Sequence, residues 1–142
     1  MKNAKEMIRE NNFCVLSTCR DDIPNSSLMK YVCNEMVNEI YMLAIKESNK
    51  YLNIVSNPHV SFLVDTRSES QENEAIIQAL TVYGDAAIIE DEVMSKLIKE
   101  RLVEANPNLA VLANNKESCV IKVKINSMLM LNNVSESRFS KI

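Results

Sequence analysis

"FCVLSTCRDDIPNSSLMKYVC" (residues 13–33) is the stretch of sequence that decides the fold. Its two ends, 13–19 and 26–33, are rich in apolar and β-branched residues, which favour strands. Residues 20–25 between them combine acidic residues with a proline, and proline moves the residue before it out of the helical region. The stretch therefore predicts two strands joined by a turn, that is, a β-hairpin.

The segments beyond this hairpin predict further strands. Apolar, strand-like runs occupy 39–45, 59–67, 76–90 and 118–132, and Gly84 marks a bulge or bend in the third of them. With the hairpin they make six strands, joined mostly by links of hairpin length. This pattern favours the α+β class, with an antiparallel sheet closed into a small barrel, over a parallel sheet in which helices alternate with strands.

About three helices are expected to pack outside the barrel. The first covers 2–11, and the second begins near Ser48, a good N-cap residue, and ends before Pro58. A third opens at Asp91, and 106–115 predict a break followed by another helical turn. One side of the third helix is expected to carry Met94, Leu97, Ile98, Arg101 and Leu102.

Composition narrows the class of protein. A chain of 142 residues predicts one domain covering 1–142. The formal net charge of −3 argues against broad binding of nucleic acid. No apolar run approaches the roughly 20 residues that cross a bilayer, which argues against a membrane partner. The start, "MKNAKEMIRENN", is charged and lacks an apolar core, so we expect no export and a cytoplasmic location.

The cysteines predict neither a disulfide nor a metal site. The chain has four cysteines, none in a C-x-x-C pair, and His59 alone cannot complete a zinc set of recognisable spacing. Cys14, Cys33 and Cys119 fall in apolar, strand-like runs, where a free cysteine behaves as a small hydrophobic residue. All four are expected to be free thiols in a reducing compartment.

A single glycine, Gly84, excludes two kinds of phosphate site. A Rossmann fingerprint and a P-loop both need several glycines, so that the backbone can approach a phosphate closely. Any phosphate must therefore be held by side chains and the end of a helix.

"AIKESNKYLNIVSNP" (44–58) is the candidate for such a site, because a strand there turns directly into a helix. Ser48 is a good N-cap, and Lys50 in the first turn is unfavourable for the helix dipole unless an anion binds beside it. Glu47 argues against a phosphate, which its carboxylate would repel. The alternative interpretation is an ordinary capped helix with solvated lysines, and both remain open on these residues alone.

The order of these elements resembles the flavin-binding split-barrel proteins related to pyridoxamine 5′-phosphate oxidase. "FCVLSTCRDDIPNSSLMKYV", "EIYMLAIKESNKYLNIVSNPHVSFLVDT" and "LTVYGDAAIIEDEV" carry the resemblance, which covers roughly residues 1–132. It implies a six-stranded antiparallel split β-barrel with about three packed helices, and a homodimer that holds FMN between its subunits. The vitamin-salvage oxidase itself is not expected, because "SESRFSKI" does not match the arginine-containing segment that binds the substrate phosphate in those oxidases.

The resemblance also implies which residues hold the cofactor. One group binds the phosphate, a second matches the first strand, a third lies along the flavin ring, and a fourth belongs to the dimer-related part of the site. In that order the matching residues are Ser48, Asn49 and Lys50 with Lys46 close by, then Ser17 and Thr18, then Met29, Lys30 and Tyr31, and finally Thr66 and Arg67. No metal is expected.

Two of these assignments have a purely structural alternative. Met29 and Tyr31 share one face of their strand and could belong to the core or to a dimer interface. Arg67 precedes the polar segment 68–75, predicted to be a mobile loop, and could simply pair with an acidic residue of that segment, Glu69 or Glu72.

The leading functional hypothesis is an FMN-dependent oxidoreductase with an unknown small-molecule substrate. No residue stands out as a general acid or base, and none is assigned as catalytic, because redox chemistry belongs to the flavin. The alternative is a non-catalytic flavin-binding protein of electron transfer or stress response. A third option is a member of the family that holds another cofactor, such as haem or a deazaflavin.

Overall fold

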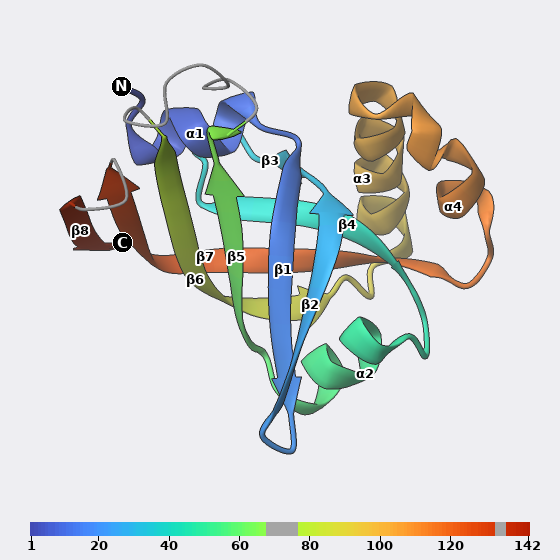
Figure 1. Cartoon of the computed structure of the whole chain (residues 1–142). Helices are drawn as coiled ribbons and strands as arrows, with labels where there is room; N and C mark the ends of the chain where they lie inside the picture. The colour runs from blue at the N-terminus through green and yellow to red at the C-terminus, as the bar shows by residue number, and fades with distance from the viewer. Residues whose placement is uncertain (68–76, 133–135) are drawn as a thin grey trace.

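The structure is a computed structural model that describes residues 1–67, 77–132 and 136–142 (Figure 1). The strands are β1 (Phe13–Arg20), β2 (Ile23–Lys30), β3 (Val32–Cys33), β4 (Glu39–Ile45), β5 (His59–Asp65), β6 (Gln78–Ile88), β7 (Ser118–Asn132) and β8 (Glu136–Lys141). The helices are α1 (Ala4–Glu10), α2 (Asn49–Ser56), α3 (Glu92–Ala105), the 3-10 turn η3 (Pro107–Leu109) and α4 (Ala110–Asn114). The predicted loop 68–75 lies outside the described residues.

One curled antiparallel sheet forms the body of the molecule. Its strands run in the order β2-β1-β5-β6-β7-β4-β3, and β8 pairs with the far end of β7. Figure 1 shows β7 and β4 crossing behind β1, β2 and β5, so that the sheet closes into a half-barrel. The predicted α+β class is therefore confirmed, and so is an antiparallel sheet that curls toward a barrel.

The predicted counts of six strands and about three helices are too low for the described residues. The expected strand over 26–33 is two strands, because Tyr31 leaves the ladder and donates its N–H to Asn12 O at 3.0 Å. β8 was not predicted, since "ESRFSK" has no clear apolar alternation. Helix α4 follows the break at Asn106, where only one more helical turn was expected.

The hairpin is tighter than the sequence suggested. Asp21 and Asp22 alone form the turn, with φ angles of 53° and 62°. Two consecutive residues with positive φ are typical of the type I′ turn, whose twist matches that of its strands, and aspartate tolerates this region better than most residues. Pro24 therefore lies inside β2 rather than in the turn, which is possible because β2 is an edge strand.

The core lies inside the half-barrel and is built by strict alternation. Cys14, Leu16, Phe62, Val64 and Val82 point inward and are almost fully buried. The register with β7 slips between Tyr83 and Gly84, at the predicted bulge, and the extra residue there is Asn126 of β7. β6 keeps its alternation through Gly84, whereas the buried positions of β7 change from odd to even residue numbers. A side chain at Gly84 would lie within 2.8 Å of Val123 Cγ1, so glycine is required by the close approach of β7.

α3 packs on the outside of the sheet and makes a second, smaller core. Ile98 and Leu102 are buried against Tyr41, Leu43 and Val120 of β4 and β7. The remaining apolar residues predicted for this side, Met94 and Leu97, are half-exposed instead, with 50 % and 55 % of their surface accessible. The helix thus buries a narrower stripe than expected, in which Ile98 and Leu102 are the buried residues.

Two further expectations concern the cysteine thiols and membrane-spanning helices. All four cysteines are free thiols, as predicted. No helix in the described part of the chain combines the length and apolar character needed to cross a bilayer.

Candidate functional site

The turn that leads from β4 into α2 has a defined geometry. Ser48 donates its N–H to Ile45 O at 3.2 Å, which closes a four-residue turn. Glu47, its third residue, has a φ of 70°, as a type II turn requires. The Lys46 N–H bonds to Glu117 O at 2.9 Å, and this bond anchors the turn to the segment that precedes β7.

The N-terminus of α2 is capped by the predicted residue and remains open to a ligand. Ser48 Oγ accepts a hydrogen bond from the Tyr51 N–H at 3.4 Å. Within the described chain, the N–H groups of Asn49 and Lys50 have no acceptor. The first turn of α2 contains no acidic residue. Free N–H groups, the positive end of the helix dipole and the Lys50 ammonium together form a site that suits an anion.

A buried hydrogen bond holds α2 against the hairpin. Asn53 Nδ2 donates to Thr18 Oγ1 at 2.9 Å, and both side chains are at least 95 % buried. Thr18 therefore positions the helix, whereas Ser17 lies on the other face of β1, with Ser26 of β2 opposite it. Asn53 was not among the predicted residues. A contact between residues 35 positions apart leaves no local signal in the sequence.

The residues predicted to lie along the flavin ring occupy both faces of the sheet edge. Met29 and Tyr31 belong to the core, with exposed fractions of 8 % and 2 %, and the Tyr31 hydroxyl donates to Ile8 O at 2.6 Å. Lys30 faces outward, with its Nζ 5.2 Å from the centre of the Phe13 ring. Along this strand, a ligand on the outer surface would meet backbone and Lys30, because the core encloses the other two side chains.

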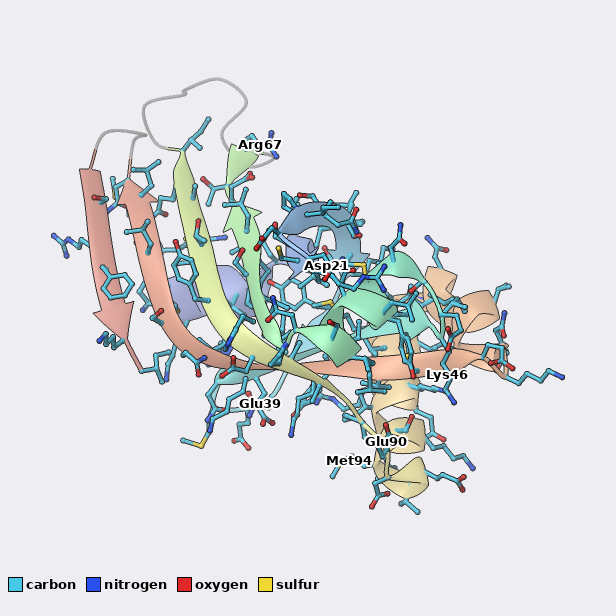
Figure 2. All side chains as sticks on the ribbon, turned by 90° about the horizontal axis from the view of Figure 1, so that it is seen from below. Asp21, Glu39, Lys46, Arg67, Glu90 and Met94 are labelled. Atoms are coloured by element: carbon cyan, nitrogen blue, oxygen red, sulfur yellow. The ribbon has the colours of Figure 1, made fainter. Side chains whose placement is uncertain are left out.

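Arg67 lies far from α2 within one chain. Its Nε is 3.1 Å from both carboxylate oxygens of Asp65, so its partner among the described residues is the residue two positions before it. Glu69 and Glu72, the partners considered from the sequence, lie outside the described residues. Figure 2 shows Arg67 at one end of the sheet and Lys46 near α2 and α3, so one subunit does not bring them together.

The predicted residues therefore lie in several separate places. Thr18, Ser48, Asn49 and Lys50 gather where α2 meets β1, and Ser17 lies on the opposite face of β1. Lys30 lies on the outer face of β2, and Arg67 lies at the far end of β5. Lys46 lines a separate cavity beside α3, which none of the other predicted residues lines.

His59, the first residue of β5, forms a polar cluster with Asp85 and Asn126. Its Nδ1 lies 2.9 Å from Asp85 Oδ1, and Asn126 Nδ2 donates to the other oxygen, Oδ2, at 2.9 Å. The Asn126 and His59 hydrogen bonds lower the pKa of Asp85. Among the described residues, no group of three or more His, Cys, Asp or Glu side chains could hold a metal ion.

Comparison with known families places the chain. Residues 1–132 match the sequence family described as pyridoxamine 5′-phosphate oxidase. The chain belongs to this family. The match runs from the N-terminus to the end of β7 and so includes the α2 turn, the hairpin and α3. A search of curated protein sequences returned no match.

Solved structures show the same fold in this family at low sequence identity. General stress protein 26 from Bacillus anthracis is 23 % identical, with a TM-score of 0.72 over 97 % of this chain and 98 % of that one. A FAD-binding protein from Mesorhizobium loti is 15 % identical (TM-score 0.73; 91 % and 94 % covered). The heme storage protein of Vibrio cholerae is 17 % identical (TM-score 0.71; 86 % and 87 % covered). The fold therefore occurs in proteins that hold different cofactors.

Proposed function

We propose that this member of the pyridoxamine 5′-phosphate oxidase family binds FMN and acts as an FMN-dependent oxidoreductase on a small molecule. The observation that carries the proposal is the open N-terminus of α2, where the N–H groups of Asn49 and Lys50 have no acceptor among the described residues. A phosphate of about two negative charges would satisfy both groups and the Lys50 ammonium.

The residues around this helix end have separate tasks in the proposed site. Ser48 holds the first turn of α2 through its Oγ, which accepts a hydrogen bond from the Tyr51 N–H. Lys50, half-buried, supplies a point charge there. The Thr18–Asn53 bond keeps the helix seated on β1, so that the phosphate position is fixed relative to the outer face of the hairpin. When bound, FMN would supply the redox chemistry, while these residues bind and orient it.

A homodimer would complete the proposed site, and the outer face of the sheet supports one. A row of side chains in direct register crosses six strands on that face: Leu28, Val15, Leu63, Thr81, Leu129 and Phe139. Leu28 and Phe139 at the two ends are 71 % and 57 % exposed. Five of the six side chains are apolar, and a largely apolar band of this kind indicates an interaction surface. We assign it to a second copy of the chain, with FMN at the boundary between the two subunits.

A haem protein is the second candidate, and His59 is the observation that favours it. Its ring nitrogen Nδ1 pairs with Asp85, which leaves Nε2 facing solvent, and 82 % of the side chain is exposed. A histidine whose second nitrogen bonds a carboxylate is the usual form of a metal ligand. The absorption spectrum separates the two candidates, because bound flavin and bound haem have different visible bands.

The test is cofactor binding by purified protein. Titration with FMN, followed by quenching of flavin fluorescence, should show saturable binding. The double substitution Ser48→Ala/Lys50→Ala should weaken it about tenfold or more, the scale of lost charge-assisted hydrogen bonds. Lys5→Ala, an exposed lysine on α1, is the matched control and should leave FMN affinity unchanged.

Three results would count against the proposal. Equal FMN affinity in the double variant and the parent would refute the phosphate assignment. A haem spectrum that is lost in His59→Ala would favour the second candidate. If neither NADH nor NADPH reduces the bound FMN, the hypothesis that the protein is an autonomous reductase is refuted.

A further inference from the structure

A cavity of about 560 Å³ opens between α1, β3 and the C-terminal half of α3. β3 contacts both helices, and Figure 1 shows it between them, at the opposite end of the barrel from α2. None of residues 46–50, which form the proposed phosphate turn, lines this cavity. Of the residues predicted to hold the cofactor, only Tyr31 lines it, and the Tyr31 side chain belongs to the core. The cavity therefore lies apart from the proposed flavin phosphate position.

The cavity has an apolar floor and a charged rim. The buried Ile8 and Tyr31 and the half-buried Val32 and Cys33 form the floor. The exposed residues at the rim are Arg9, Glu10, Asn12, Glu35, Arg101 and Ala105. The volume falls in the usual range of small-molecule sites, about 300–1,000 Å³, and such sites combine an apolar lining with a few polar groups.

Two guanidinium groups from distant segments converge on one part of the floor. Arg101 Nη2 donates to Cys33 O at 2.9 Å, which fixes this side chain at the edge of the cavity. Neither Arg9 nor Arg101 forms an ion pair with any side chain that the structure describes. Burial raises the pKa of the Cys33 thiol, whereas Arg9 and Arg101 both lower it, so both guanidiniums lie close to this thiol.

The charges at the rim leave an excess of one positive charge. Glu10 Oε2 lies 3.8 Å from Lys2 Nζ, and this ion pair offsets the charge of Glu10. Arg9 and Arg101 then stand against Glu35 alone. This balance favours a monoanion. A carboxylate is a monoanion whose two oxygens match the paired N–H groups of a guanidinium.

A buried amide beside the cavity lacks a hydrogen-bond partner. Asn106 is 2 % exposed, and its Nδ2 has no acceptor among the described residues. Its Oδ1 accepts a hydrogen bond from Asn12 Nδ2 at 3.1 Å, and Ala105 precedes it in the chain. Both Asn12 and Ala105 line the cavity, so the unpaired donor lies next to its wall. Because a buried donor without an acceptor is costly, an oxygen brought to this part of the cavity would be stabilising.

We propose that this cavity binds a small organic monocarboxylate with an apolar body, at a site separate from the flavin. Its carboxylate would bridge Arg9 and Arg101 and would bring an acceptor, directly or through a bound water, to Asn106 Nδ2. Its apolar body would cover Val32 and Cys33 at the floor. The proposal does not rest on bound FMN, because the phosphate turn contributes no residue to this cavity.

3-Phenylpropionate is the probe, and calorimetric titration is the measurement. Protein as purified, and the same protein with excess FMN, should both bind 3-phenylpropionate with a Kd below about 1 mM. 3-Phenylpropanamide has no charge, and acetate has almost no apolar body. Each should bind at least about tenfold more weakly, because each loses one set of contacts.

Substitutions of opposite sign test the electrostatics. Arg9→Gln should weaken binding of 3-phenylpropionate about threefold to tenfold, whereas Glu35→Gln should strengthen it by a similar factor. Both side chains are exposed, so neither variant should disturb the fold. Lys5→Gln, an exposed position on the same helix as Arg9, is the matched control and should leave the affinity unchanged.

Thiol alkylation locates the bound probe. Cys33 lies at the floor, so 3-phenylpropionate at about five times its Kd should slow the reaction of Cys33 with iodoacetamide about sixfold. Cys19 is half-buried as well but does not line this cavity, so it is the internal control and its rate should not change. Peptide mass spectrometry measures the two rates separately.

Four outcomes would overturn the proposal. They are no binding of 3-phenylpropionate, equal affinity in Arg9→Gln, Glu35→Gln and the parent, equal slowing of Cys19 and Cys33, and displacement of the probe by FMN. None of these results changes the FMN titration of the Ser48→Ala/Lys50→Ala variant, so this proposal and the proposed function fail independently.

Discussion

Glu47 adopts a backbone conformation that shapes the proposed phosphate turn and costs conformational free energy. Its φ of 70° is a left-handed conformation that is unfavourable for a residue with a side chain by about 1–2 kcal/mol. The turn nevertheless has to reverse the chain there so that Ser48 can cap α2. The Glu47 carboxylate is exposed, so it does not block the space in which a phosphate would bind. It disfavours a phosphate only through its negative charge close to the helix end.

Glu47→Gly should stabilise the protein by about 1 kcal/mol, because glycine adopts positive φ without strain. It should also strengthen FMN binding, since a negative charge leaves the neighbourhood of the phosphate. Glu47→Ala is the matched control: it removes the same charge but keeps the strained φ, so it should strengthen FMN binding without the gain in stability. Urea unfolding and FMN titration measure the two effects. A glycine variant no more stable than the alanine variant would contradict the strain argument.

Because the Cys14 thiol is buried, we expect the folded protein to lose stability at high pH. Burial raises the pKa of this thiol from 9.0 to about 12. The unfolded chain releases this proton above pH 9 while the folded chain keeps it, so the contribution of Cys14 is complete below pH 9 and declines between pH 9 and 12 by about 1.4 kcal/mol per pH unit. Burial also raises the pKa of Tyr31, which adds to the decline.

Urea unfolding between pH 8 and 11 measures this dependence. Cys14→Ala should be less stable than the parent at pH 8, because it leaves a cavity in the core, but its stability should fall less steeply with pH. Parallel curves for the two proteins would show that Cys14 does not contribute.

At the scale of elements, the seat of α2 on the hairpin rests on one polar contact. Thr18→Val should destabilise the fold by about 1–3 kcal/mol, because Asn53 Nδ2 loses its buried acceptor. Thr18→Ser keeps the hydroxyl and is the matched control, with a smaller loss. The double variant Thr18→Val/Asn53→Leu should recover part of the stability, since no polar atom is then left unpaired. Thermal unfolding measures the stability of all three variants. If the losses of stability from Thr18→Val alone and Asn53→Leu alone add up fully in the double variant, the contact between the two residues is unimportant.

At the scale of the whole molecule, the outer face of the sheet should decide the oligomeric state. We expect the parent protein to sediment as a dimer and Leu28→Glu to sediment as a monomer with weaker FMN binding, because a charge would be buried within the band. Ile23→Glu, on the same strand but outside that band, is the matched control. A parent protein that sediments as a monomer while it holds FMN tightly would exclude the dimeric site.

Prediction from the sequence succeeded best where the signal was local. The cap at Ser48, the bounds of β4 and the register shift at Gly84 all follow from residue type and from periodicity over a few positions. The type I′ turn at Asp21 and Asp22 was missed, because neither residue is a glycine and the nearby proline indicated a longer turn. The candidate site was only partly predictable: Lys46 adjoins Ser48 in sequence, yet its side chain lines another cavity.

The sequence by itself determined the antiparallel α+β barrel, the capped helix after β4 and the lack of a glycine-rich phosphate loop, since each depends on nearest neighbours and on composition. Only the tertiary structure decided that Met29 and Tyr31 belong to the core, that Asn53 ties α2 to Thr18, and that two arginines from distant segments border one cavity. The physical reason is that an alternating strand defines two faces but not which of them is enclosed. That choice depends on which strands lie opposite, and on how far the sheet curls before it closes.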